Sequence, residues 1–218
     1  MKKLQELFEG NRQWAARMHA DAPDFFAALA QQQTPEYLWI GCSDSRVPAN
    51  EILNMLPGDV FVHRNVANQV IHADMNCLSV MQYAVEVLKV KHVMVVGHYG
   101  CGGVKAALED NHLGLIDNWL RSIRTIALKY RDILGNCTEE ERLFDRLCEL
   151  NAIEQAYNVA TSTMVQKAWA NGQELSVHAL VYGLNDGLLQ DLHFGVSCNE
   201  ELDLQMTEAI EAVANLAG

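Results

Sequence analysis

The sequence has few prolines, few basic side chains and no long apolar run. Its 218 residues include only four prolines, all before position 58, so the remainder can form long uninterrupted elements. The 28 acidic residues outnumber the 16 lysines and arginines, and a net charge of −12 excludes a basic nucleic-acid-binding face. No segment approaches the roughly 20 apolar residues of a membrane span. The opening MKKLQELFEGNRQW also lacks the apolar centre of a secretion signal, which predicts a cytoplasmic protein.

Cysteine is present in six copies, but nothing else in the sequence indicates a disulfide framework. Half of the residues are hydrophobic, so a chain of this length can build a core without covalent links. In a long chain with no secretion signal, free thiols or metal ligands are expected in place of disulfides. The cysteines are Cys42, Cys77, Cys101, Cys137, Cys148 and Cys198.

Strand and helix patterns alternate along the chain, which predicts an α/β fold in a single domain, 1–218. The run HVMVVG is continuous and rich in β-branched residues, as is typical of a parallel strand covered on both faces. The turn sequence Asn185-Asp186-Gly187 predicts a hairpin, so the last strand is antiparallel. We therefore expect a mainly parallel central sheet with one antiparallel edge strand, flanked by helices. The expected strands lie at 37–42, 60–63, 92–97, 175–182 and 188–194.

Apolar residues at helical spacing predict a helical arm in residues 1–34 and several longer helices after it. Thr138 and Glu141 match a capping box that opens a helix reaching Asn171. The other expected helices lie at 3–19, 24–32, 76–90, 115–134 and from about 200 to the end.

Two of the predicted parallel strands end in side chains that can bind a metal ion. One strand ends in Cys42 and is followed by Asp44, and the run HVMVVG is followed by His98 and Cys101. Sites in open α/β sheets form outside the carboxyl ends of the strands, so these four side chains are expected to converge. Two thiolates, one imidazole and one carboxylate suit a tetrahedral zinc ion, whereas calcium and magnesium prefer oxygen ligands. The prediction is one Zn2+ per chain.

Each of these features has a simpler interpretation when taken alone. Buried free cysteines are common, and this interpretation is adopted for the four cysteines outside the predicted cluster. Gly100 and Gly102 resemble the start of a dinucleotide-binding loop, but the third glycine is missing from its place. A zinc ion closed by four protein ligands would be inert, so a structural zinc-site protein is an alternative function.

Three short motifs resemble those of the β-class carbonic anhydrases: CSDSR at 42–46, HRNVAN at 63–68 and HYGCGG at 98–103. The family pattern C-x-D-x-R followed by H-x-x-C is complete in this sequence. The resemblance implies zinc and the reversible hydration of carbon dioxide to bicarbonate and a proton. It also implies a homodimer or a dimer of dimers in which the arm, 1–34, contacts the partner subunit. Neither a nucleic acid nor a membrane is expected as a partner.

Asp44 and Arg46 are the predicted catalytic residues. A catalytic zinc needs an open position for water, and four protein ligands would close it. A bidentate pair with Arg46 would hold the Asp44 carboxylate off the metal, so that a zinc-bound hydroxide attacks carbon dioxide. Because two thiolates neutralise the dication, we expect activity to rise on the alkaline side of neutral. A hydrolase of a similar small molecule, such as carbonyl sulfide or carbon disulfide, is an alternative function for the same site.

A second set of residues resembles the bicarbonate pocket of a bacterial, bicarbonate-regulated subgroup of the family. The set consists of Trp39, Gly41, Arg64 and Tyr182. The resemblance implies that bicarbonate pairs with the guanidinium, accepts hydrogen bonds from the two aromatic side chains and favours the closed state, with Asp44 on zinc. From the residue patterns alone, core aromatics and a structural ion-pair arginine explain the same set.

The substrate cleft is inferred only from the resemblance. Its expected residues are Gln33, Phe61, Val66, Tyr83 and Gly102. A narrow apolar lining, built partly across a dimer interface, suits a small apolar gas, and an amide near the metal can hydrogen-bond bicarbonate. Ordinary packing at a subunit interface is the alternative explanation for these side chains.

Overall fold

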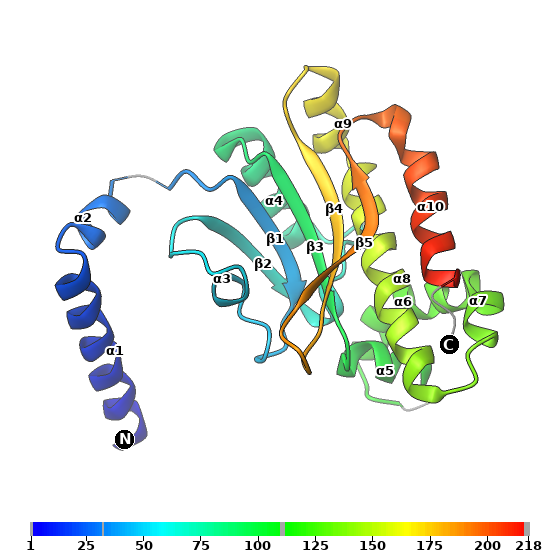
Figure 1. The fold of residues 1–218 in the computed structure, drawn as a ribbon, viewed down its shortest axis with the longest axis horizontal. Coiled ribbons are helices and arrows are strands. Elements are labelled where there is room, and N and C mark those ends of the chain that lie inside the picture. Colours follow the sequence, from blue (N-terminus) through cyan, green and yellow to red (C-terminus); the bar gives the residue numbers. More distant parts are fainter. Residues whose placement is uncertain (1, 32, 110–111, 216–218) are drawn as a thin grey trace. The chain divides into compact units, whose positions relative to one another are not determined.

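The computed structural model describes residues 2–31, 33–109 and 112–215. The chain divides into two compact units, Met1–Thr34 and Pro35–Gly218. The first unit contains α1 (Lys2–Asp21) and α2 (Phe25–Leu29), joined by a short turn (Figure 1). Trp14 of α1 packs edge-on against Phe26 of α2 with 5.7 Å between ring centroids, while Leu7 and Phe8 are exposed. The predicted helical arm is therefore present, and apolar side chains remain on its surface.

The second unit is built on a five-stranded sheet whose strands follow the order β2-β1-β3-β4-β5. The first four strands are parallel, and β5 is antiparallel to β4, which confirms the predicted fold class. Gly41 of β1 pairs with Val96 of β3, so the carboxyl ends of these neighbouring strands lie side by side. The strands are β1 (Tyr37–Cys42), β2 (Val60–Asn65), β3 (His92–His98), β4 (Ser176–Tyr182) and β5 (Leu189–Val196).

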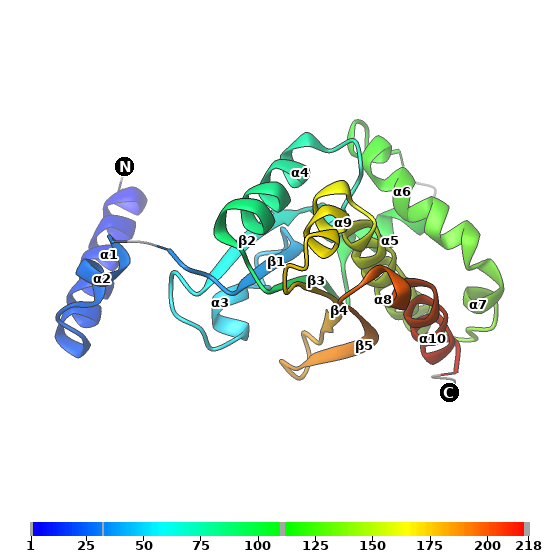
Figure 2. The same cartoon turned by 90° about the horizontal axis from the view of Figure 1, so that it is seen from above.

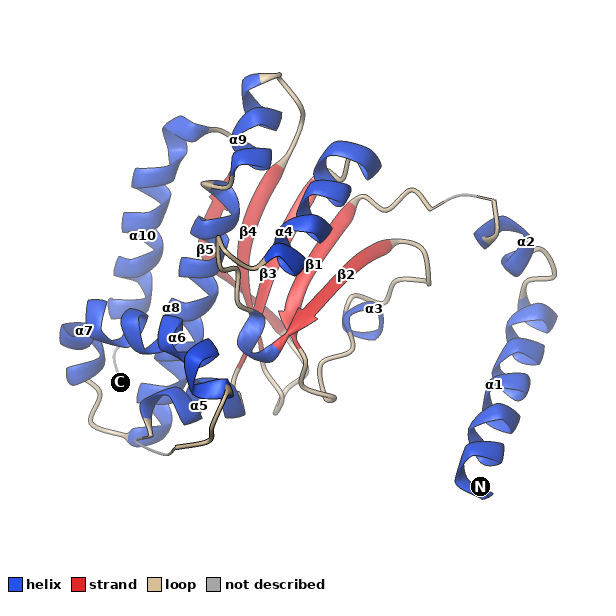
Figure 3. Ribbon diagram, turned by 180° about the vertical axis from the view of Figure 1, so that it is seen from behind, coloured by secondary structure: helices blue, strands red, loops and turns tan. Residues whose placement is uncertain are grey.

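Helices cover the two faces of this sheet unequally. Figure 2 shows α4, α8 and α9 on one face, while the short α3 lies on the other. No helix among the described residues is long and apolar enough to cross a membrane. The helices of this unit are α3 (Ala49–Ile52), α4 (Met75–Gln82), α5 (Gly102–Leu108), α6 (Ile116–Lys129), α7 (Arg131–Gly135), α8 (Glu140–Ala160), α9 (Thr163–Ala170) and α10 (Leu202–Asn215) (Figure 3). Three short segments of other helix types complete this unit. Two are 3-10 helices, η1 (Val66–Asn68) and η3 (Asn199–Glu201), and one is a π-helix, η2 (Tyr83–Leu88).

The alternation of side chains along β1 divides the core between the two faces. Leu38 and Ile40 are fully buried in the large cluster that includes the apolar side chains of α8. Trp39, which points to the opposite face, is fully buried in a smaller cluster with Met94 and Val96. Burial on both faces explains why β1 and β3 are apolar without interruption.

The long helix predicted from the capping box at Thr138 is two helices. The backbone breaks between α8 and α9, where the Thr161 hydroxyl donates to the Tyr157 carbonyl and the Ser162 hydroxyl donates to the Val159 carbonyl. Such local bonds compete with helix continuation. The N-cap of α8 is Glu139, with no side-chain capping bond, so the predicted capping box is wrong.

The helix predicted at 76–90 also changes character along its length. It begins as α4, where the Asp74 side chain accepts a capping bond from the Asn76 amide. From Tyr83 it continues as the wider π-helical turn η2, and it ends at Lys89 in the left-handed conformation. Isolated π turns of this kind occur often at functional sites, and this one begins at a predicted cleft residue.

Candidate metal centre

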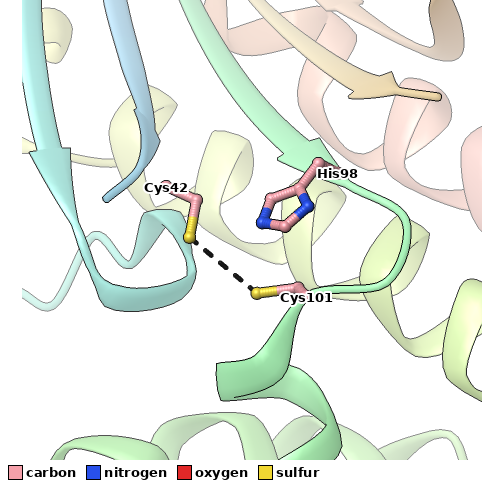
Figure 4. A group of neighbouring side chains, drawn as sticks. All are labelled: Cys42, His98 and Cys101. Atoms are coloured by element: carbon pink, nitrogen blue, oxygen red, sulfur yellow. Dashed lines mark hydrogen bonds between the residues drawn. The ribbon is translucent and has the colours of Figure 1, made fainter. Parts of the chain in front are cut away.

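The carboxyl ends of β1 and β3 bring two cysteines and a histidine together. Cys42 is the last residue of β1, His98 is the last residue of β3, and Cys101 immediately precedes α5 (Figure 4). Their ligand atoms lie within 4.8 Å of one another, and all three residues are buried. In the part of the chain that the structure describes, this is the one group of three or more His, Cys, Asp or Glu residues able to hold a metal ion.

The geometry of this cluster fits a metal ion. The two Sγ atoms are 3.9 Å apart, close to the spacing of about 3.8 Å for two sulfurs at about 2.3 Å from one tetrahedral zinc. They are too far apart for a disulfide, and all six cysteines are free. His98 Nδ1 donates to the Tyr99 carbonyl at 2.9 Å, which leaves the lone pair on Nε2. Nε2 is buried and has no hydrogen-bond partner in the described structure. Its lone pair is therefore available to bind a metal ion.

The two sulfurs are hydrogen-bonded to each other. Their hydrogen bond lowers the pKa of the Cys42 thiol to about 4 against the opposing effect of burial, and it raises the pKa of Cys101. Cys42 Sγ also accepts a hydrogen bond from the Ala67 amide at 3.4 Å. A dication favours deprotonated sulfur ligands, so its binding would release the proton of this hydrogen bond.

Asp44 lies beside the cluster but is paired with Arg46. The guanidinium donates to Oδ1 at 2.9 Å and to Oδ2 at 2.7 Å, and the Arg46 amide also donates to Oδ1 at 3.0 Å. These bonds lower the pKa of the Asp44 carboxyl well below its usual range. Asp44 Oδ2 is 3.8 Å from His98 Nε2. Three of the four predicted ligands, Cys42, His98 and Cys101, thus lie together. The fourth, Asp44, lies beside them and makes the predicted two-point pair with Arg46.

The residues of the predicted bicarbonate pocket lie on three strands next to the metal cluster. Trp39 is fully buried and its Nε1 has no partner among the described residues. The indole lies so close over Gly41 that a Cβ there would be 2.1 Å from Nε1, which requires glycine at this position. Arg64 faces Gly41 across the strands and donates to the backbone carbonyls of Cys42, at 2.8 Å, and Asp44. Tyr182 packs against the apolar cluster that contains Trp39.

The predicted cleft residues are divided between the two units. In the second unit, the rings of Phe61 and Tyr83 are 5.8 Å apart, and the Tyr83 side chain is 43% exposed. Gly102 is exposed at the start of α5, and Val66 is partly buried in η1. Gln33 is exposed and belongs to the first unit.

Several side chains that support the site were not found from the sequence. Gln69 and Asn151 bind the turn that carries the Ala67 amide, and Tyr99 is held by a 2.7 Å bond from its hydroxyl to Glu149. For Glu149 and Asn151 the only signal was their position as polar residues within the apolar series of α8, which periodicity alone does not interpret. The bonds of Tyr99 to Glu149 and of Asn151 to Ala67 join residues that are 50 and 84 positions apart in the sequence.

Known proteins resemble this chain in both sequence and structure. The family model described as "Carbonic anhydrase" matches residues 37–189. A carbonic anhydrase of Emericella nidulans is 48% identical over 188 residues, which are 86% of this chain and 82% of that protein. The solved Coccomyxa β-carbonic anhydrase in complex with acetazolamide is 39% identical, with a TM-score of 0.89, over 98% of this chain and 99% of that one. A tetrameric β-carbonic anhydrase of Sordaria macrospora is 37% identical, with a TM-score of 0.85, over 90% of this chain and 100% of that one.

These likenesses and the Cys-His-Cys cluster assign the class of the protein. The chain belongs to the carbonic anhydrase family and, within it, to the β class. The prediction that it is an enzyme of the carbonic anhydrase type is thereby confirmed. The Emericella and Sordaria relatives are fungal, so they give no support to the predicted bacterial subgroup.

Proposed function

We propose that the chain catalyses the zinc-dependent, reversible hydration of carbon dioxide to bicarbonate and a proton. The observation that supports this most directly is the buried, unpartnered Nε2 of His98 beside two sulfurs at the spacing of shared zinc ligands. Cys42, His98 and Cys101 would hold one zinc ion per chain. Zinc bound there would supply a Lewis acid that makes water nucleophilic near neutral pH.

Asp44 and Arg46 would decide whether this metal site is open. With its carboxylate held in the two-point pair, Asp44 would leave one ligand position of a bound metal ion open to water. The same carboxylate would accept a hydrogen bond from that water and so orient it. If the pair breaks, the carboxylate is near enough to complete the ligand set and close the site. A structural zinc site has no need of a cation placed to hold a ligand away, so the pair favours the enzymatic function over that alternative.

We further propose that bicarbonate regulates the enzyme at Trp39, Gly41, Arg64 and Tyr182, as in the bacterial subgroup. A buried indole N–H without an acceptor is costly, and an anion would satisfy it. Arg64 already donates to the carbonyls of Cys42 and Asp44, so an anion that draws its guanidinium away would loosen the segment carrying both residues. Binding would thereby favour the closed, Asp44-ligated state.

The remaining sequence predictions stay proposals. Residues 1–218 would form one β-carbonic anhydrase domain in a homodimer or a dimer of dimers, with the arm, 1–34, contacting a partner. Gln33 would then join Phe61, Val66, Tyr83 and Gly102 around the substrate. The exposed apolar side chains of the arm and the tetrameric Sordaria relative support an oligomer. A cytoplasmic location also stays a prediction.

One experiment tests the main proposal. Stopped-flow hydration of carbon dioxide is measured on the purified chain, alongside a metal assay. We expect about one zinc per chain and turnover that chelation removes and zinc restores. A chain that binds zinc but only hydrolyses carbonyl sulfide or carbon disulfide would favour the alternative hydrolase, and a chain without zinc would contradict both.

A further inference from the structure

The turn η1 links the end of β2 to the metal cluster. The Ala67 amide donates to Cys42 Sγ at 3.4 Å. The same turn packs against the start of α5, the helix that follows Cys101, because a Cβ on Gly103 would lie 2.9 Å from Val66 Cγ1 and 3.2 Å from the Ala67 Cβ. This turn therefore contacts the elements that carry both cysteine ligands.

Ala67, in the middle of η1, has a backbone conformation that alanine does not favour. Ala67 has φ 62° and ψ 36°, and Asn68 has φ 47°. Left-handed backbone is uncommon for residues with a Cβ, and alanine, unlike asparagine, has no polar side chain that could stabilise it by a local hydrogen bond. Such a conformation persists only where the surrounding structure holds it in place.

Two buried amide side chains hold this turn through the carbonyl of Ala67. Asn151 Nδ2 donates to this oxygen at 3.0 Å, and Gln69 Nε2 donates to it at 2.7 Å. Gln69 Nε2 also donates to Asn151 Oδ1 at 2.7 Å, and Ser122 Oγ donates to Gln69 Oε1 at 2.6 Å. Gln69 is fully buried and Asn151 is 1% exposed, so water does not compete for these bonds.

We propose that Asn151 is a positioning residue for the metal centre. Together with Gln69 it fixes Ala67 in the left-handed conformation and so keeps the amide of Ala67 directed at Cys42 Sγ. A hydrogen bond to a ligating thiolate reduces the charge that the sulfur donates to the metal, and partners of this kind tune affinity and reactivity. The inference rests on the proposed metal site, and it assigns a role to a helix α8 side chain that is not itself a ligand.

The chain offers a matched control on the same helix. Asn158 of α8 donates from Nδ2 to the carbonyl of Val70 at 3.0 Å, which is the same chemistry directed at a residue with no bond to a cysteine. Asn151→Leu and Asn158→Leu each remove one bond from an amide side chain of α8 to a backbone carbonyl of the loop after β2. Asn151→Leu also removes the oxygen that accepts from Gln69 and Gln155, and Asn158→Leu also removes a donor to Gln155. Both variants are expected to lose stability, whereas only the first should alter the metal centre.

The test uses Co2+ and Zn2+ binding to the full chain. Affinity is measured by competition with a chromophoric chelator, and the thiolate-to-cobalt absorption band is recorded. We expect Asn151→Leu to shift this band and to weaken metal binding about tenfold. Asn158→Leu should leave the band in place and the affinity within about twofold of the original. Adding Ala67→Gly to Asn151→Leu should restore the band, because glycine adopts left-handed backbone without support.

The outcomes separate this inference from the metal site itself. If the original chain binds cobalt with a thiolate band and Asn151→Leu behaves like Asn158→Leu, the positioning role is wrong and the metal site stands. If the original chain binds neither ion, both are wrong. Should Asn151→Leu not fold, Gln69→Met removes the other amide donor to the Ala67 carbonyl. The same band shift is then expected, and an unchanged band overturns the role.

Discussion

The Asp44 carboxylate and the Arg46 guanidinium meet at two points, with Nε to Oδ1 at 2.9 Å and Nη2 to Oδ2 at 2.7 Å. Arg46 is 57% exposed, and exposed ion pairs contribute little to folding stability. Asp44 is much less exposed, and its Oδ2 lies 3.8 Å from Nε2 of His98, the nitrogen that we propose as a metal ligand. The pair therefore matters less for folding stability than for the position of the Asp44 carboxylate, which it holds beside the proposed metal ligands.

Arg46→Ala should lower kcat/KM for carbon dioxide hydration by about 100-fold or more, because the freed carboxylate moves toward the metal ligands. The free energy of unfolding should change by less than about 1 kcal/mol. Arg46→Lys should also lose activity, since an ammonium cannot make the two-point contact. Arg131, an exposed arginine paired with Asp132, provides the control. Equal turnover in Arg46→Ala and Arg131→Ala would contradict the proposed switch.

Trp39→Phe should weaken inhibition by bicarbonate about tenfold, because it removes the one buried indole donor that we assign to the anion. Removing an unsatisfied donor should offset part of the stability lost to the cavity that the smaller ring leaves. Trp169→Phe is the matched control, since the Trp169 Nε1 already donates to the Leu175 carbonyl at 2.8 Å. Inhibition curves of carbon dioxide hydration decide the point, and identical curves for the two variants would exclude Trp39 from the pocket.

The sequence predicted those parts of the fold and site that depend on local pattern and strand ends. The apolar runs predicted the strands. The cysteine and histidine side chains at or just after the ends of β1 and β3 predicted Cys42, His98 and Cys101 as candidate metal ligands. The left-handed turn at Ala67 was not predicted, because its cause is a pair of amides brought to it by tertiary packing. The end of α8 was missed for a different reason: the apolar spacing continues past Ser162 while local hydroxyl bonds interrupt the backbone.

Metal removal should destabilise the fold, because the ligand atoms are buried and His98 Nε2 has no hydrogen-bond partner among the described residues. Zinc at about a thousandfold above its Kd would add about 4 kcal/mol, or roughly 10 °C in Tm for a chain of this size. Thermal unfolding with and without a chelator measures this difference. Cys101→Ser should abolish it, and Cys198→Ser, at a thiol outside the cluster, should not. A chelator effect of the same size in both variants would place the stabilising metal elsewhere.

Glu149 should make stability fall as the pH rises above the usual range of a glutamate. Burial raises the pKa of its carboxyl, which is 1% exposed, although the Tyr99 hydroxyl donates to Oε1 and the positive charges of Arg142 and Arg146 act in the opposite direction. The folded chain therefore keeps a proton that the unfolded chain has already released, so unfolding becomes easier as the pH rises through that interval.

Glu149→Gln keeps an acceptor for the Tyr99 hydroxyl but cannot ionise. Its free energy of unfolding, relative to that of the original chain, should therefore increase from pH 5 to pH 8. Urea unfolding of the zinc-loaded proteins at several pH values measures the difference in the free energy of unfolding. Glu211→Gln, at an exposed carboxylate of α10, should show no such trend. A constant difference between Glu149→Gln and the original chain across this range would mean that Glu149 ionises at the same pH in the folded and unfolded chain.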